Sequence, residues 1–247
     1  MAARWLQALI GEDLVRWGLA ARHRGTPLGD YYRVDTPTTD TPWDTVPFLA
    51  VDLETTGLDP QADAIVSIGW VPVIGGRVVL AEARHHVVRV ARPMPEASAV
   101  LHGILDDEAA AARGLEQVLP EFLAALKGRV PVAHHAASER EFLDAACRRL
   151  YGAPLVVPYV DTLGLEVRQC KRRGDTMGPG QLRLPACRER YGLPRYRAHN
   201  ALVDAVACAE LLLAQVAYMT PQPVRIGAQG AGRVDGRHPI RLEQLLT

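Results

Sequence analysis

The most constraining feature of this sequence is a change of pattern near residue 90, where strand-like segments give way to helices that alternate with short strands. Before that point three successive segments have strand character, and Gly75-Gly76 is a strong hairpin signal between the last two. This order is typical of an α/β fold in which a mixed sheet carries helices on both faces. The five predicted strands are 47–53, 64–73, 77–90, 129–135 and 154–162, and the predicted helices are 107–127, 138–150, 181–191 and 200–217.

The segments on either side of this region differ from it in composition. Apolar residues at helical spacing between residues 4 and 22 predict one helix or two short ones, and Pro, Thr and Asp in 36–47 predict a loop. From residue 220 the chain is rich in Gly and Pro, which predicts a flexible or loosely docked tail. We therefore expect an N-terminal helical extension and linker at 1–45, one domain at 46–218 and a C-terminal tail at 219–247.

Charge excludes no class of partner, because 28 basic residues balance 28 acidic ones. Locally, residues 148–197 carry 11 Lys or Arg against four Asp or Glu. A basic strip of this kind either attracts phosphates or forms a solvated helix face, and both interpretations stay open.

Cysteine spacing and hydropathy indicate the compartment. The four cysteines show no C-x-x-C spacing, so neither a zinc site nor a disulfide framework is expected, and free thiols are typical of a reducing compartment. No apolar run approaches the roughly 20 residues of a membrane span, and Glu12 and Asp13 interrupt the N-terminal apolar stretch. We expect a cytoplasmic protein with no signal peptide and no membrane partner.

Two carboxylates, Asp52 and Glu54, end the first predicted strand in "FLAVDLETTGLDP". Strand side chains alternate between faces, so both point the same way, with Cα atoms about 7 Å apart. Like charges at this spacing raise each other's pKa unless a cation lies between them. The pair is either half of a metal site or a solvated strand end.

Three further residues are candidates for the same site. Ser138 and Glu141 fit a capping box, which makes Glu139 a first-turn acid whose alternative role is to compensate the helix dipole. Asp204 lies on or near the buried face of an apolar helix, where an acid is costly unless it is paired or metal-bound. His199 shares a site with Asp204 only if it precedes that helix, with His199 or Asn200 as the N-cap.

Taken together, "DLETTGLD", "AHHAASEREFL" and "AHNALVD" resemble the three motifs of the DEDDh 3′-to-5′ exonucleases. That family includes the proofreading epsilon subunit of bacterial DNA polymerase III. The resemblance spans about residues 46 to 217, and "LHGI" at 101–104 and "DTL" at 161–163 match further family landmarks. It implies a ribonuclease H-like fold, in agreement with the strand order above.

The resemblance also implies roles for individual residues. Two divalent ions, Mg²⁺ or Mn²⁺, would activate a water and stabilise the leaving oxygen. An imidazole is suited to the role of general base because it ordinarily titrates near neutral pH. The implied metal-site acids are Asp52, Glu54, Glu139 and Asp204, the general base is His199, and the substrate-binding residues are Thr55, Thr56, Gly57, Leu58, His102 and His134.

The second motif departs from the usual H-N-x-x-F-D. Here His135 replaces Asn, Ser138 replaces Phe and Glu139 replaces Asp, so an aromatic packing residue is lost and the acidic arm gains a methylene. These changes put the role of the second motif in question.

The expected function is a metal-dependent 3′-to-5′ exonuclease acting on single-stranded ends, with DNA favoured over RNA. The alternatives are an oligoribonuclease-type RNA exonuclease and a catalytically silent module that binds nucleic acid or a polymerase. The N-terminal helices either dock a partner such as a polymerase or cover the sheet.

Overall fold

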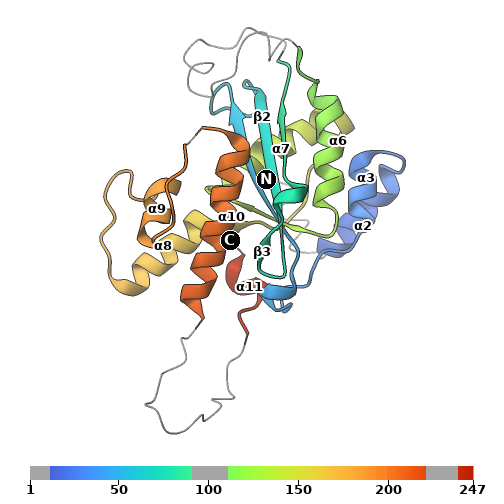
Figure 1. The fold of residues 1–247 in the computed structure, drawn as a ribbon. Coiled ribbons are helices and arrows are strands. Elements are labelled where there is room, and N and C mark those ends of the chain that lie inside the picture. The colour runs from blue at the N-terminus through green and yellow to red at the C-terminus, as the bar shows by residue number, and fades with distance from the viewer. Residues whose placement is uncertain (1–11, 91–110, 198, 221–238, 247) are drawn as a thin grey trace.

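The computed structural model describes residues 12–90, 111–197, 199–220 and 239–246. Figure 1 shows a single curled sheet with helices packed on both of its faces. Strand β1 (Phe48–Thr55) is central: it runs antiparallel to β2 (Ile65–Ile74) and parallel to β5 (Val130–Ala133), which is parallel to β6 (Val160–Asp161). The predicted mixed α/β sheet is therefore confirmed, and it has the ribonuclease H-like arrangement.

The third predicted strand, 77–90, is broken in the structure. It forms two short strands, β3 (Arg77–Val78) and β4 (Arg84–Val87), which are separated by the 3₁₀ turn η2 (Leu80–Glu82) and both pair with β2. In the part of the chain that the structure describes, the sheet thus has six strand segments along five positions. Residues 77–90 contain no Gly or Pro that would mark this break, so the local sequence does not predict it.

Several helices differ from their predicted bounds. Helix α6 (Leu115–Leu126) begins after Gly114, its N-cap, so residues 112–114 of the predicted 107–127 helix are not helical. Helix α8 (Thr162–Arg173) was not predicted, and it shortens the predicted strand 154–162 to the two residues of β6. The remaining elements are α2 (Glu12–Arg22), α3 (Pro27–Tyr32), η1 (Trp43–Thr45), α7 (Ala136–Tyr151), α9 (Leu184–Arg190), α10 (Ala201–Met219) and α11 (Leu242–Leu245).

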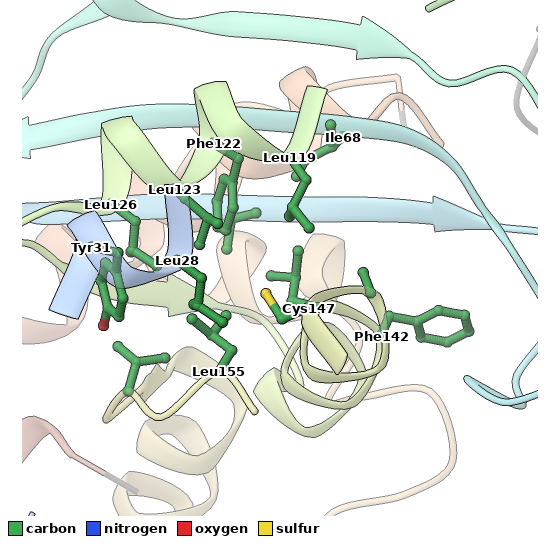
Figure 2. Packing of buried hydrophobic residues seen from close by; sticks show 14 of the residues in the cluster. Leu28, Tyr31, Ile68, Leu119, Phe122, Leu123, Leu126, Phe142, Cys147 and Leu155 are labelled. Atoms are coloured by element: carbon green, nitrogen blue, oxygen red, sulfur yellow. The ribbon is translucent and has the colours of Figure 1, made fainter. Parts of the chain in front are cut away.

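The N-terminal helices share the core of the main domain. Leu28 and Tyr31 of α3 are fully buried beside Phe122 and Leu123 of α6, as Figure 2 shows. The guanidinium of Arg16, on α2, donates to the carbonyl of Val156 at 3.1 Å. Residues 12–32 therefore help to cover one face of the sheet, and the domain boundary at residue 46 stays a prediction.

The last described residues pack against the opposite face. Leu242 and Leu245 of α11 are fully buried with residues of β1 and α10, and Arg168 donates to the carbonyls of Gln244 and Leu246 at 3.1 and 3.0 Å. Residues 239–246 are thus firmly docked, so the prediction of a flexible or loosely docked tail is wrong for them. The prediction failed because an apolar segment this short shows no periodicity from which a docked helix can be predicted.

Helix α10 is the one described helix that is long and apolar enough to span a membrane by length and composition. Nearly half of its most apolar window, 44%, is buried inside the molecule, and Ala209 and Leu212 pack on the sheet with Phe48 of β1. A core helix of a globular domain has these properties. The sequence-based statement that no apolar run approaches this length was therefore too strict.

Candidate active site

The acid pair at the end of β1 lies on the face of the sheet that α10 covers. Phe48 and Ala50 belong to the core cluster beneath α10, and Asp52 and Glu54 continue that alternation along the strand. Asp204, on the first turn of α10, completes the group, since ligand atoms of these three acids all lie within 4.8 Å of one another. The structure therefore brings Asp204 next to two acids that precede it by 152 and 150 positions in the sequence.

A glycine in β2 makes this approach possible. Gly69 pairs with Asp52, and a Cβ at this position would lie 2.2 Å from the backbone nitrogen of Leu202 and 2.3 Å from the carbonyl carbon of Ala201. The first turn of α10 therefore rests directly on the backbone of β2. Sequence reasoning missed this residue, although a glycine inside a strand pattern is the signal of a close backbone approach.

Two histidines in left-handed backbone conformation precede the helices that carry site residues. His199 has φ 69° and precedes Asn200, the N-cap of α10, whose side chain accepts from Val203 N at 3.1 Å. The backbone N–H of His199 donates to Oδ2 of Asp204 at 2.8 Å. The prediction that His199 precedes the helix, with Asn200 as a possible cap, is thus confirmed.

His135 repeats this arrangement at α7. It has φ 73°, is the N-cap of α7, and its backbone N–H donates to Oδ1 of Asp161 at 2.9 Å. The helix begins at Ala136, so the predicted Ser138–Glu141 capping box is wrong, because the N-cap is three residues earlier than Ser138. Asn and His are both enriched at left-handed positions, which explains how His135 can replace the usual asparagine of the motif.

Glu139 lies on the first turn of α7, and its side chain is buried. Its Oε2 atom has no hydrogen-bond partner among the described residues. Burial, followed by repulsion from Asp161 and Glu54, raises the pKa of Glu139 to about 8. A buried carboxyl oxygen without a partner is expensive, so this group calls for a cation or a proton.

The pKa values of the other acids are raised as well. Burial, followed by repulsion from Glu139, Asp204 and Glu54, raises the pKa of Asp52 well above its ordinary value. Burial and then Asp204 raise the pKa of Glu54 to about 7. The pKa of Asp204 is also raised by burial, although the N–H groups of His199 and Asn200 oppose the shift.

These observations show that the residues fit a divalent ion. A group of mutually repelling carboxylates, one with an unsatisfied buried oxygen, is relieved most directly by bound cations. Oxygen-only donors suit Mg²⁺ and Mn²⁺ and do not suit soft metals. Asp52, Glu54 and Asp204 would hold the ion, with Glu139 adjoining them.

The threonine hydroxyl groups of the turn after β1 form hydrogen bonds within the protein. Thr55 Oγ1 donates to the carbonyl of Gly57 at 2.7 Å, and Thr56 Oγ1 donates to Oδ1 of Asp63 at 3.0 Å. Leu58 projects into solvent with 94% of its surface exposed. Of the turn residues predicted to bind substrate, Leu58 is thus the one whose side chain is most available.

His134 is engaged on both sides of its ring. Nδ1 lies 2.9 Å from Thr162 Oγ1, and Nε2 lies 2.8 Å from the carbonyl of Leu182. Burial lowers the pKa of the imidazole, and Nε2 donates to the carbonyl because a carbonyl oxygen can only accept. Its role as a substrate-binding residue stays a prediction, and His102 lies outside the described residues.

A cavity of about 850 Å³ opens over the acids. Asp52, Asp204 and His199 line one part of it, and residues 177–185, between α8 and α9, line another. This places two of the acids, the predicted base and a largely apolar wall around one space that a nucleotide could enter.

Comparison with known proteins identifies the family that the chain resembles. Residues 49–212 match the RNase_T exonuclease family. The chain is 36% identical to the PolC-type DNA polymerase III of Thermotoga maritima over 172 residues, which are 70% of this chain and 12% of that protein. It is 32% identical to the DNA polymerase III subunit epsilon of Treponema pallidum, with 72% of this chain and 80% of that protein covered. The chain therefore spans about an eighth of its PolC-type relatives.

Solved structures agree with this assignment. Exonuclease X in complex with 5′ overhanging duplex DNA has a TM-score of 0.53 at 25% identity, over 69% of this chain and 92% of that one. The nuclease domain of 3′hExo, a DEDDh family member bound to rAMP, has a TM-score of 0.61 at 18% identity, over 72% and 95% of the two chains. The Escherichia coli ExoI–ssDNA complex has a TM-score of 0.61 at 17% identity, over 70% and 41%.

The family match includes β2 to β6, all of β1 except Phe48, and the four acids of the site. This chain belongs to the RNase_T exonuclease family, and the epsilon subunit of a bacterial DNA polymerase III is among its relatives.

Proposed function

We propose that this protein is a 3′-to-5′ exonuclease that removes nucleoside monophosphates from single-stranded DNA ends with two divalent ions, Mg²⁺ or Mn²⁺. The observation that carries the proposal is the group of Asp52, Glu54 and Asp204, whose ligand atoms lie within 4.8 Å of one another. Asp52 and Asp204 line a cavity of about 850 Å³, and the buried Glu139 nearby has a carboxyl oxygen without a partner in the described residues. When bound, the ions would lower the pKa of the attacking water and stabilise the leaving oxygen.

The chain's own groups supply the rest of the reaction. His199 lines the cavity with Asp52 and Asp204 and is exposed, so its imidazole can accept a proton from a water there. The hydrogen bond from its backbone N–H to Asp204 ties the position of the base to that of a metal-site acid. Leu58, exposed on the turn next to Glu54, would contact the terminal base.

The test is a cleavage assay on 5′-labelled substrates. Single-stranded DNA, single-stranded RNA and a 3′-mismatched duplex are incubated with Mg²⁺, with Mn²⁺ or with a chelator. We expect a ladder that shortens from the 3′ end, fastest on single-stranded DNA and absent in chelator. Full activity in excess chelator would contradict the metal-dependent mechanism, and inert protein in all lanes would favour a silent binding module.

RNA is the second candidate substrate. The structural neighbour 3′hExo was solved with rAMP, whereas Exonuclease X and ExoI were solved with DNA and the sequence relatives are DNA polymerase III proteins. The balance favours DNA. A faster ladder on RNA in the same assay would reverse the choice and indicate contacts to the 2′-hydroxyl group.

A replicative polymerase is the proposed protein partner, and helix α2 is the proposed contact. Leu14 and Trp17 of this helix are 60% and 72% exposed, and Trp17 borders a cavity of about 640 Å³. The PolC-type relatives have the matching region within a much longer polymerase polypeptide. Co-elution with the replicative polymerase of the same organism, lost in Trp17→Ser, would test this contact.

A cytoplasmic location is proposed with this function. All four cysteines are free and buried, as is usual in a reducing compartment, and the relatives are replication proteins. Fractionation of cells that express a tagged chain would check it.

A further inference from the structure

The cavity over the acids has a second wall that the motifs do not include. Residues 177–185, between α8 and α9, contribute the side chains of Met177, Leu182 and Leu184 together with one cation, Arg183. In Figure 1 this stretch leads into α9, beside α8 and α10. A wall that combines apolar surface with a cation is the combination that proteins use for single-stranded nucleic acid.

The wall is built into the fold. His134 Nε2 donates to the carbonyl of Leu182 at 2.8 Å, and Arg190 donates to the carbonyl of Gln181, also at 2.8 Å. Arg190 is in turn held at 2.9 Å by Glu166, a carboxylate with no exposed surface. Hydrogen bonds from two side chains therefore fix the backbone at Gln181 and Leu182, directly before Arg183, and a surface held in this way binds at a reduced ordering cost.

Arg183 differs from three neighbouring arginines in having no acidic partner among the described residues. Arg173, Arg188 and Arg190 pair with Asp175, Glu210 and Glu166. Arg183 is exposed, and no acid in the described part of the chain lies within ion-pair distance of it. A cation without a pair at the rim of a cavity suits an anionic ligand, and guanidinium groups match phosphate geometry.

We propose that residues 177–185 form the second wall of the substrate groove, in which Arg183 binds a backbone phosphate of the single strand upstream of the scissile one. This assignment rests on the proposed nuclease function. The scissile phosphate would lie against the acids, through the ions they hold, so the rim position of Arg183 corresponds to a phosphate further from the 3′ end. Met177 and Leu182 contact the bases between these two phosphates. The basic strip of the sequence thus contributes one phosphate ligand, Arg183. The arginines of the strip that form ion pairs support the fold instead.

The test separates nucleic-acid binding from chemistry. Wild type, Arg183→Ala, Arg183→Lys and the control Arg149→Ala are compared. Arg149 is also exposed, but it lies ten residues beyond Glu139 on α7, about 15 Å along the helix. Binding of a fluorescein-labelled oligothymidylate of about 12 nucleotides is measured by anisotropy in chelator at several salt concentrations. Turnover is measured on the p-nitrophenyl ester of thymidine 5′-monophosphate, which has no upstream phosphate.

For Arg183→Ala we expect the oligothymidylate Kd to rise about tenfold and the slope of log Kd against log salt concentration to fall by about 0.7, the loss of one phosphate contact to a single strand. Arg183→Lys keeps the slope, Arg149→Ala matches wild type, and all variants hydrolyse the ester at the wild-type rate. An unchanged Kd and slope in Arg183→Ala would overturn the inference, as would a parallel loss of ester hydrolysis.

Failure of the proposed function has a different signature. If wild type hydrolyses neither the ester nor the oligonucleotide with Mg²⁺ or Mn²⁺, the nuclease assignment falls. The anisotropy measurement still decides the role of Arg183, because it needs neither metal nor turnover.

Discussion

At the scale of single residues, Glu139 combines a raised pKa and a carboxyl oxygen without a partner in the described residues with a departure from the family motif. As a helix-dipole partner it would contribute only about 0.3–1 kcal/mol to stability. As a metal-site acid it is needed for turnover. Glu139→Gln keeps the size and removes the charge, and we expect weaker Mg²⁺ binding, a large loss of rate and a near-normal melting temperature. The measurement is cleavage rate against Mg²⁺ concentration.

The matched control is Glu141→Gln, an exposed acid on the same helix, which should behave as wild type. Glu139→Asp restores the acid that is usual in the motif, but the helix still begins after His135 and the usual aromatic residue is still missing. We therefore expect partial activity. If Glu139→Gln follows the wild-type curve at every Mg²⁺ concentration, the second motif holds no ion.

His199 has a side-chain role and a backbone role that substitutions can separate. Asn tolerates the left-handed conformation and keeps the N–H bond to Asp204, whereas Ala at this position carries about 1 kcal/mol of strain. We expect both His199→Asn and His199→Ala to lose about 10²–10⁴-fold in rate at pH 7, with only the Ala variant less stable. The loss should shrink at high pH, where hydroxide replaces the base.

Rates and thermal melts of the two variants, taken at several pH values, check this prediction. An Asn variant as fast as wild type at pH 7 would remove the imidazole from the mechanism and leave His199 with a backbone role alone.

At the scale of elements, the contact between β2 and α10 sets the geometry of the site. In Gly69→Ala the added methyl would meet the backbone of Ala201 and Leu202, so the first turn of α10 must move outward and carry Asp204 with it. Overpacking of this kind costs about 1–3 kcal/mol, and a shift of about 1 Å at a catalytic group can cost about 10²-fold in rate.

The matched control is Gly18→Ala on α2, where an added Cβ meets no atom within 4 Å and helix propensity predicts a gain of about 1 kcal/mol. Steady-state rates and urea melts of both variants provide the comparison. Wild-type activity in Gly69→Ala would show that α10 can lift from the sheet without moving the acids apart.

At the scale of the whole molecule, the acids make metal-free stability depend on pH. Their folded-state pKa values are raised, to about 7 for Glu54 and about 8 for Glu139, so the folded protein binds more protons than the unfolded chain above about pH 4.5. The free energy of unfolding therefore falls as pH rises from about 5 to 8, by up to about 1.4 kcal/mol per pKa unit for each group.

Urea melts in chelator at pH 5 and pH 8 measure this fall, and Mg²⁺ should reverse it at pH 8. Asp204→Ala removes one of the repelling charges, so we expect a flatter pH dependence in chelator together with nearly complete loss of activity. A metal-free protein that is equally stable at both pH values would contradict the electrostatic reading of the site.

The sequence by itself determined which acids share a face and which strand carries them. Alternation along 48–54 places Asp52 and Glu54 together, and the apolar helix around Asp204 requires a partner for its charge, because both are properties of local periodicity and burial. The same local rules predicted the mixed sheet and the non-helical backbone at His199.

Only the tertiary structure decided how these parts meet. The close approach at Gly69, the engagement of both ring nitrogens of His134, the cavity wall around Arg183, the break between β3 and β4 and the docking of residues 239–246 all depend on contacts between segments far apart in the chain. Such contacts leave no periodic trace in the sequence, since their free energy comes from the partner segment and not from the local pattern.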